Sequence, residues 1–220
     1  MTNHPLLRAD HLSFQYTPFD EKRKVPLFDR FSFALAPGER VAVAGRSGAG
    51  KSALLRLFAR LLEPTGGILF FRERPYGEYF APTLRRQVAL VPQTPVIFDG
   101  DGRTNLTLHL DAPPDDATLR TWLDRFDLPA DLLDREGRAL SVGQKSRLTV
   151  IRSLLMAPDV VLLDEPTAGL DAATEKIVVA ALTEESQRRG MAMIVSAHHL
   201  DLIGPMVDRT ITLHPPAEAA

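Results

Sequence analysis

The sequence predicts an α/β fold with a parallel sheet at its centre, and two observations carry this prediction. Short segments rich in β-branched residues recur along the chain, and most of them are apolar at every position. A strand that is apolar on both faces fits a sheet that helices cover on both sides, which is the usual form of a parallel sheet. The segments expected to form strands are 31–35, 40–44, 68–71, 88–91, 160–163, 193–195 and 210–213.

Helices are expected in the longer stretches between these strands. One begins at residue 51 and ends before a turn at 63–67, and others cover about 116–126 and 142–156. Polar and proline-interrupted segments over 104–140 predict a small helical lobe inserted into the core. We therefore expect one domain over 1–220, with a core lobe of about 1–92 and 157–214, a helical lobe of about 93–156 and a flexible tail at 215–220.

Composition and charge argue against several classes of protein. With 26 Lys and Arg against 28 Asp and Glu the formal charge is −2, which gives no electrostatic reason to expect a nucleic-acid partner. The absence of cysteine excludes disulfides, thiolate metal sites and cysteine nucleophiles. No apolar run reaches the ~18–20 residues of a membrane-spanning helix, and the N-terminus lacks a signal-peptide core, so we expect a soluble, cytoplasmic protein.

A phosphate-binding loop is the strongest local signal. Residues 45–52 read GRSGAGKS, fit the pattern G-x4-G-K-[ST], and lie between a predicted buried strand and a predicted helix. The glycines let backbone N–H groups turn inward around an anion, and the helix adds its positive N-terminal end. Lys51 is a point charge for the outer phosphates, and the Ser52 hydroxyl is a Mg²⁺ ligand. The predicted phosphate-binding residues are Gly45, Arg46, Ser47, Gly48, Ala49, Gly50, Lys51 and Ser52.

Two carboxylates follow a buried strand in the sequence VVLLDEP, residues 160–166. The carboxyl end of a parallel strand is where open α/β sheets bind ligands. Asp164 is suited to hold Mg²⁺, and Glu165 to polarise an attacking water. Alone, this stretch would be interpreted as a turn that ends a buried strand. The phosphate loop upstream favours the catalytic interpretation.

In order, and with further elements between them, these motifs resemble the ABC ATPase family over essentially the whole chain. Residues 140–144, LSVGQ, are similar to the LSGGQ motif of that family, with Val142 in place of its first glycine. The resemblance implies an ABC-type nucleotide-binding domain: a P-loop NTPase with a RecA-like core, an antiparallel β edge and an inserted helical subdomain. The implied cofactors are ATP and Mg²⁺.

The resemblance also assigns roles to residues that the chain pattern alone leaves undefined. Gln93 matches the glutamine that connects the lobes and contacts Mg²⁺ and the water, and His198 matches the histidine that reads the γ-phosphate. Tyr16 resembles the aromatic residue that stacks on adenine. The implied catalytic residues are Lys51, Gln93, Glu165 and His198, and the implied metal ligands are Ser52, Gln93 and Asp164. Contacts with the ATP of a second subunit are implied for Ser141, Gly143, Gln144 and Asp171.

The function implied by the family is a motor that closes as a head-to-tail homodimer around two ATP molecules and drives a separate polytopic membrane permease. The protein would then lie in the cytoplasm, on the inner face of the membrane. The permease is expected to meet residues 95–106, where three apolar residues, Val96, Ile97 and Phe98, could instead fill a seam between the lobes. A weaker similarity points to the small stand-alone ATPases of metal (iron) export systems.

Two alternatives remain at this stage. The first is an ABC ATPase that acts on DNA or ribosomes instead of a transporter. Such proteins usually carry two cassettes or long coiled-coil insertions, and this sequence has neither. The second is a P-loop nucleotide kinase, which the 141–144 motif and His198 disfavour.

Overall fold

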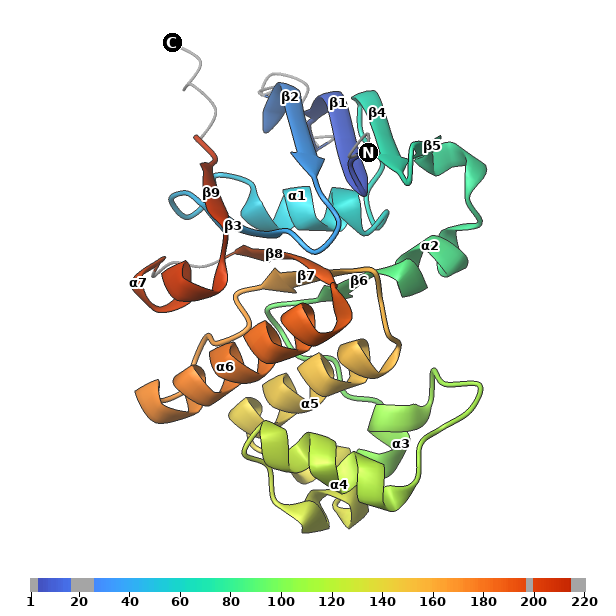
Figure 1. Cartoon of the computed structure of the whole chain (residues 1–220), viewed down its shortest axis with the longest axis vertical. Coiled ribbons are helices and arrows are strands. Elements are labelled where there is room, and N and C mark those ends of the chain that lie inside the picture. Colours follow the sequence, from blue (N-terminus) through green and yellow to red (C-terminus); the bar gives the residue numbers. More distant parts are fainter. Residues whose placement is uncertain (1–3, 17–25, 197–199, 215–220) are drawn as a thin grey trace.

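A five-stranded parallel sheet forms the centre of the molecule (Figure 1). The computed structural model describes residues 4–16, 26–196 and 200–214. The strand order is β6-β7-β8-β3-β9, and each strand runs parallel to its neighbours. The predicted parallel sheet is therefore confirmed. Its strands are β3 (Arg40–Ala44), β6 (Val88–Val91), β7 (Val160–Asp164), β8 (Ala192–Ser196) and β9 (Arg209–Thr212).

A second, antiparallel sheet lies above the first, and helix α1 (Lys51–Phe58) lies between the two (Figure 1). Its strand order is β2-β1-β4-β5, which matches the expected antiparallel edge. Helix α1 ends at Phe58, one turn before the end at residue 62 that the sequence predicts. Arg60, just beyond the helix, has a left-handed backbone with φ 53°. The strands are β1 (Leu7–Phe14), β2 (Phe28–Leu35), β4 (Gly66–Phe71) and β5 (Arg74–Pro75).

The other side of the parallel sheet is covered by helices that include α3 (Gly102–Thr107), α4 (Asp116–Arg125), α5 (Val142–Leu155) and α6 (Ala172–Arg189) (Figure 1). Strand β7 shows why its sequence is apolar throughout. Val160 and Leu162 pack in the core with α1, while Val161 and Leu163 pack in the core with α5 and α6. Successive side chains of a strand point to opposite faces, so both faces of this sheet are buried.

Side-chain caps fix where several of these helices begin. Asp101, Asp115 and Asp171 accept backbone N–H hydrogen bonds at the starts of α3, α4 and α6, over 2.7, 2.9 and 3.0 Å. The short elements that complete the described chain are α2 (Ala81–Gln87), α7 (Leu200–Ile203) and 3₁₀ turns at Tyr76–Glu78, Ala130–Asp134, Gly137–Ala139 and Gly204–Met206.

The division into two lobes at about residues 93 and 156 stays a prediction. A single buried cluster joins Leu119 and Leu123 of α4 to Leu148 of α5 and to Val161 of β7, so the packing is continuous across the expected boundary. Within the described residues, no helix is both long and apolar enough to cross a bilayer. The tail at 215–220 lies outside the described residues.

Candidate active site

The loop between β3 and α1 depends on glycine at two positions. Gly45 has φ 152°, and a Cβ there would lie 2.7 Å from the carbonyl oxygen of Leu213. Gly50 has φ 94°, and a Cβ there would lie 2.8 Å from Cζ of Phe28. Neither position has room for a side chain, so the two glycines fix the path of the loop between its neighbours. Helix α1 then begins at Lys51, with its first N–H groups at the loop.

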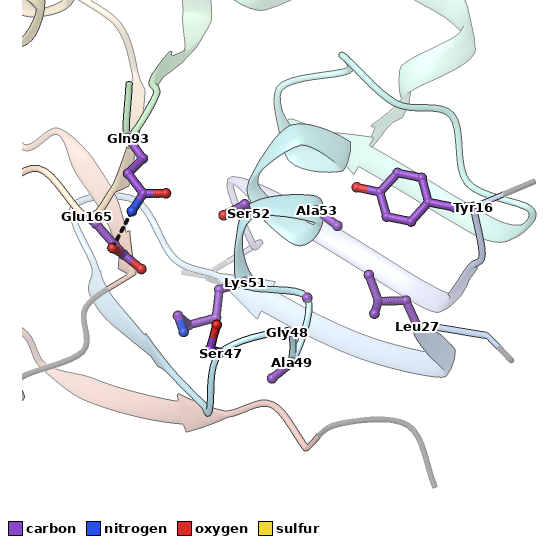
Figure 2. Close-up of a pocket in the computed structure, with 11 residues that line it drawn as sticks. Tyr16, Leu27, Ser47, Gly48, Ala49, Lys51, Ser52, Ala53, Gln93 and Glu165 are labelled. Atoms are coloured by element: carbon purple, nitrogen blue, oxygen red, sulfur yellow. Dashed lines mark hydrogen bonds between the residues drawn. The ribbon is translucent and has the colours of Figure 1, made fainter. Parts of the chain in front are cut away.

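This loop forms one wall of a pocket of about 300 Å³ (Figure 2). The pocket joins residues from regions of the chain that are far apart in sequence, including the aromatic Tyr16 after β1, Gln93 after β6 and Glu165 after β7. The structure thus brings these three predicted residues to the predicted phosphate loop. The lining residues are Tyr16, Leu27, Ser47, Gly48, Ala49, Gly50, Lys51, Ser52, Ala53, Gln93 and Glu165.

The side chain of Lys51 is held across the loop. Its Nζ donates to the carbonyl oxygen of Gly45 over 2.8 Å and lies 3.5 Å from that of Arg46. Lys51 is almost fully buried, and in the described part of the chain it forms no ion pair with a carboxylate. A buried ammonium whose only acceptors are neutral carbonyl groups keeps its charge available for an anion. Phosphate oxygens entering the pocket would supply that anion.

A carboxylate and two hydroxyl groups meet at the end of β7. The Ser52 hydroxyl donates to Oδ1 of Asp164 over 3.1 Å, and the Ser196 hydroxyl donates to the same oxygen over 2.8 Å. Asp164 is buried, with 3% of its surface exposed. One buried carboxylate beside a serine hydroxyl fits Mg²⁺, which proteins hold through one or two oxygen side chains and the phosphates of the substrate. Among the described residues, no group of three or more His, Cys, Asp or Glu forms a metal site by itself.

Ser196 is not among the site residues predicted from the sequence, yet it forms hydrogen bonds with both Asp164 and Glu165. Its hydroxyl contacts Asp164, and its hydroxyl and carbonyl oxygens both accept from the backbone N–H of Glu165, over 3.1 and 3.2 Å. Glu165 has a left-handed backbone with φ 51°, a strained conformation for this residue type. Gln93 Nε2 donates to Oε2 of Glu165 over 2.7 Å (Figure 2). These contacts place the Glu165 carboxylate in the pocket beside the loop.

The motif 140–144 lies at the start of α5 and does not line this pocket. Ser141 and Gln144 form a reciprocal cap: the Ser141 N–H donates to Gln144 Oε1 over 3.0 Å, and the Gln144 N–H donates to Ser141 Oγ over 3.2 Å. Val142 is 70% exposed. A Cβ on Gly143 would lie 3.1 Å from Cδ2 of Leu170, so the helix packs closely there.

Asp171 caps α6 and is therefore engaged within its own chain. It accepts from the backbone N–H groups of Ala173 and Thr174 and from the Thr174 hydroxyl. The hydrogen bond from the Thr174 N–H, followed by that from the Thr174 hydroxyl, holds the pKa of Asp171 below its usual value. Asp171, like the 140–144 motif, lies outside the pocket lining. His198 lies outside the described residues.

Comparison with known proteins identifies this arrangement. Residues 28–168 match the family described as ABC transporter. The chain belongs to the ABC transporter family. Both the resemblance to its ATPases and the expected P-loop NTPase fold are confirmed, and this membership excludes the nucleotide kinase.

This ABC ATPase is similar to proteins of very different lengths. It is 33% identical to "Probable iron export ATP-binding protein FetA" of Escherichia coli (strain K12), over 98% of this chain and 94% of that protein. It is 31% identical to the "ABC-type transporter kk1G" of Curvularia clavata over 90% of this chain, but it spans only 15% of that protein. The solved structure of a bacterial Atm1-family ABC exporter with ATP bound superposes with a TM-score of 0.84 at 27% identity, over 99% of this chain and 39% of that one.

Proposed function

We propose that this ABC ATPase binds ATP with Mg²⁺ in the pocket of Figure 2 and hydrolyses it to drive a membrane permease. The observation that carries the proposal is the meeting of Lys51, the Ser52–Asp164 pair and the Gln93–Glu165 pair at one loop. The loop N–H groups and Lys51 bind the phosphates. Ser52 and Asp164 hold Mg²⁺ with Gln93, and the ion, when bound, neutralises charge on the phosphate oxygens. Tyr16, which lies across the pocket from Gln93 and Glu165 (Figure 2), stacks on the adenine.

Hydrolysis needs a base for the attacking water, and Glu165 takes this role in the proposal. The water oxygen bonds to the γ-phosphorus as the bond to ADP breaks, and the water proton passes to the Glu165 carboxylate. Gln93 orients that carboxylate through the 2.7 Å hydrogen bond. His198 completes the site as a contact to the γ-phosphate.

A second subunit is part of the proposal because half of the expected site lies elsewhere. Ser141, Gly143, Gln144 and Asp171 are outside the pocket of their own chain. They serve the ATP of the partner in a head-to-tail homodimer, where the N-terminus of α5 faces the phosphates. Val142 is exposed at this helix start and would lie beside the nucleotide of the partner. ATP then joins the subunits, and hydrolysis separates them.

The permease is proposed as a separate chain because the similarity to the iron export ATP-binding protein spans 94% of that relative. Export of a metal ion is the transport process that this similarity favours. The ATPase would work in the cytoplasm, on the inner face of the membrane. A role on DNA or ribosomes remains the second candidate from the sequence, and the net charge of −2 gives it no electrostatic support.

The segment after Gln93 is the proposed contact with the permease, and its three apolar residues differ in how deeply they are buried. Ile97 packs against the core of the helical side, where it approaches Gly137. Val96 and Phe98 are 47% and 38% exposed. We therefore assign different roles to these residues. Ile97 fills the seam between the lobes, and Val96 and Phe98 form the apolar surface that meets the permease.

The experiment that tests the proposed function compares two lysine variants of the purified protein. Lys51→Ala removes the cation from the pocket and is expected to abolish ATP hydrolysis and to weaken ATP binding by about tenfold or more. Lys176→Ala removes an exposed lysine from α6 and should hydrolyse ATP at the parental rate. Equal rates in Lys51→Ala and the parent would contradict the assignment of the pocket.

A further inference from the structure

The hydroxyl of Ser196 connects the two acidic residues of the site without facing the nucleotide pocket. Ser196 ends β8 and pairs in register with Asp164, which ends β7. Its side chain is completely buried, and it is not among the described residues that line the pocket. Any effect of Ser196 on a bound ligand must therefore pass through the residues that it contacts.

The contacts of this hydroxyl have a defined direction. The backbone N–H of Glu165 donates to Ser196 Oγ over 3.1 Å, and the Ser196 hydroxyl donates to Oδ1 of Asp164 over 2.8 Å. A serine hydroxyl has a single proton to donate. Because the N–H of Glu165 occupies the acceptor side of the oxygen, that proton is directed to the Asp164 carboxylate. The proposed base and the proposed Mg²⁺ ligand thus share one buried hydroxyl group.

The two carboxylate oxygens of Asp164 differ in their surroundings. Oδ1 accepts from Ser196 and also, over 3.1 Å, from the Ser52 hydroxyl. In the part of the chain that the structure describes, both hydrogen bonds that the Asp164 side chain accepts end on Oδ1. Two donors on one oxygen hold the carboxylate in a single rotation, and they leave Oδ2 available for a cation.

The two serines that hold Oδ1 have different roles. Ser52 lines the pocket and is itself a proposed ligand of Mg²⁺. Ser196 is completely buried, so it can hold the carboxylate but cannot bind the ion. A hydrogen-bond partner that orients a metal-binding carboxylate typically changes metal affinity by about 10–100-fold when it is removed. An effect of this size is large enough to be measured in a binding experiment.

We propose that Ser196 is a positioning residue for Mg²⁺: its buried hydroxyl holds Oδ1 of Asp164, so that Oδ2 faces the ion or a water bound to it. This inference rests on the proposed function, because Mg²⁺ arrives with ATP. It goes beyond that function by assigning a role in metal affinity to a residue that touches neither the metal nor the nucleotide. Without the hydroxyl, the Asp164 carboxylate is free to rotate, and metal binding weakens although every ligand is still present.

The test measures nucleotide binding instead of hydrolysis. The probe is an ATP analogue with nitrogen between its β- and γ-phosphates, which is not hydrolysed, and calorimetry gives its Kd in excess MgCl₂ and in EDTA. For Ser196→Ala we expect the Kd to rise about tenfold or more with Mg²⁺ and to stay within about twofold of the parent in EDTA.

Ser186→Ala is the matched control for the loss of a buried hydroxyl. Ser186 lies on α6, is 1% exposed, and donates to the carbonyl oxygen of Met191 over 2.8 Å. It is outside the pocket lining, so the control should bind the analogue like the parent, both with Mg²⁺ and in EDTA.

Two further variants show whether Ser196 acts through Asp164. Asp164→Asn should by itself lose the gain in affinity that Mg²⁺ gives, and adding Ser196→Ala to it should change neither Kd further. Ser196→Cys keeps the size of the side chain but offers only a weak S–H donor. It should therefore show the same loss with Mg²⁺, even if the alanine variant is too unstable to purify.

The outcomes separate this inference from the proposed function. A parental Kd with Mg²⁺ in Ser196→Ala or Ser196→Cys would overturn the role of Ser196 and leave the nucleotide site intact. Equal losses with Mg²⁺ and in EDTA would also overturn it, because they indicate general damage to the pocket, and so would a further loss in the double variant. If the parent itself binds the analogue no more tightly with Mg²⁺ than in EDTA, the proposed function fails.

Discussion

The buried carboxylate of Glu185 offers a stability test that can be worked from the structure. Glu185 lies on α6 with none of its side chain exposed, and three arginines surround it. Arg125 of α4 donates to it over 2.8 Å, Arg188 donates over 2.6 Å, and Arg189 pairs with it as well. Arg125 and Arg189 also face the ring of Trp122. The glutamate thus links α4 to α6.

Replacing Glu185 with Gln removes the buried negative charge and leaves three cations close together. Losing one partner of a fully buried ion pair costs about 3–5 kcal/mol. The arginines here are partly exposed to solvent, so screening reduces this cost. We expect the substitution to lower the free energy of unfolding by about 2–3 kcal/mol. In a domain of this size, each kcal/mol shifts the melting temperature by about 2–4 °C, so the variant should melt about 5–10 °C below the parent.

The pH dependence of this loss follows from the pKa of Glu185. Burial alone would raise that pKa, but hydrogen bonds from Arg188 and Arg125 and the charge of Arg189 outweigh burial and leave the pKa below its usual value. Such a group stabilises the fold above its unfolded pKa, and this contribution disappears as pH falls through the lower, folded pKa. The difference in stability between the parent and Glu185→Gln should therefore be largest at neutral pH and should shrink in acid, below about pH 4.

The assay is thermal unfolding followed by circular dichroism at neutral and acidic pH. Glu184→Gln is the matched control, because Glu184 is the adjacent residue, is mostly exposed and contacts Arg125 only at 3.4 Å. We expect the control to melt within about 1–2 °C of the parent. A Glu185→Gln protein that melts with the control at neutral pH would refute the reasoning about the buried charge.

Two further predictions concern the site and its docking segment. Ser196→Ala removes a hydroxyl that contacts both Asp164 and the Glu165 N–H, so ATP hydrolysis should fall about tenfold or more while the fold is kept; an unchanged rate would show that Ser196 is dispensable. Phe98→Asp should keep the parental melting temperature and ATPase rate but lose permease co-purification, whereas Ile97→Asp should lower the melting temperature by several degrees. If the two variants were equally stable, Ile97 and Phe98 would not have the different roles proposed for them.

The elements that could be predicted from the sequence are those whose pattern reports burial directly. The segments 40–44 and 88–91 match β3 and β6 at both ends, because each is a short apolar run bounded by turn or polar residues. The phosphate loop was predictable because fixed spacing and fixed residue types are needed to wrap a backbone around an anion. Its neighbours Gln93 and Tyr16 were found only through the family resemblance.

The parts that could not be predicted depend on pairing between distant segments. Ser196 is one serine at the end of an apolar run, and nothing in its spacing marks it. It becomes significant because Asp164 and Ser196 are opposite each other in the register of β7 and β8. A hollow of about 510 Å³ between α1, α2 and α5 is similar: Arg56, Arg85 and Arg152 come from these three helices, and only the packing of the helices places them around it.

The most direct test of the account is the response of Glu165→Gln to ATP in size-exclusion chromatography. Without the base, ATP should bind but not turn over, so it should hold two subunits together as a stable dimer that ADP does not support. The double variant Glu165→Gln/Ser141→Ala should lose this dimer, because Ser141 then no longer contacts the ATP of the partner. We predict a dimer only for Glu165→Gln with ATP. A Glu165→Gln protein that binds ATP with Mg²⁺ and stays monomeric would contradict it.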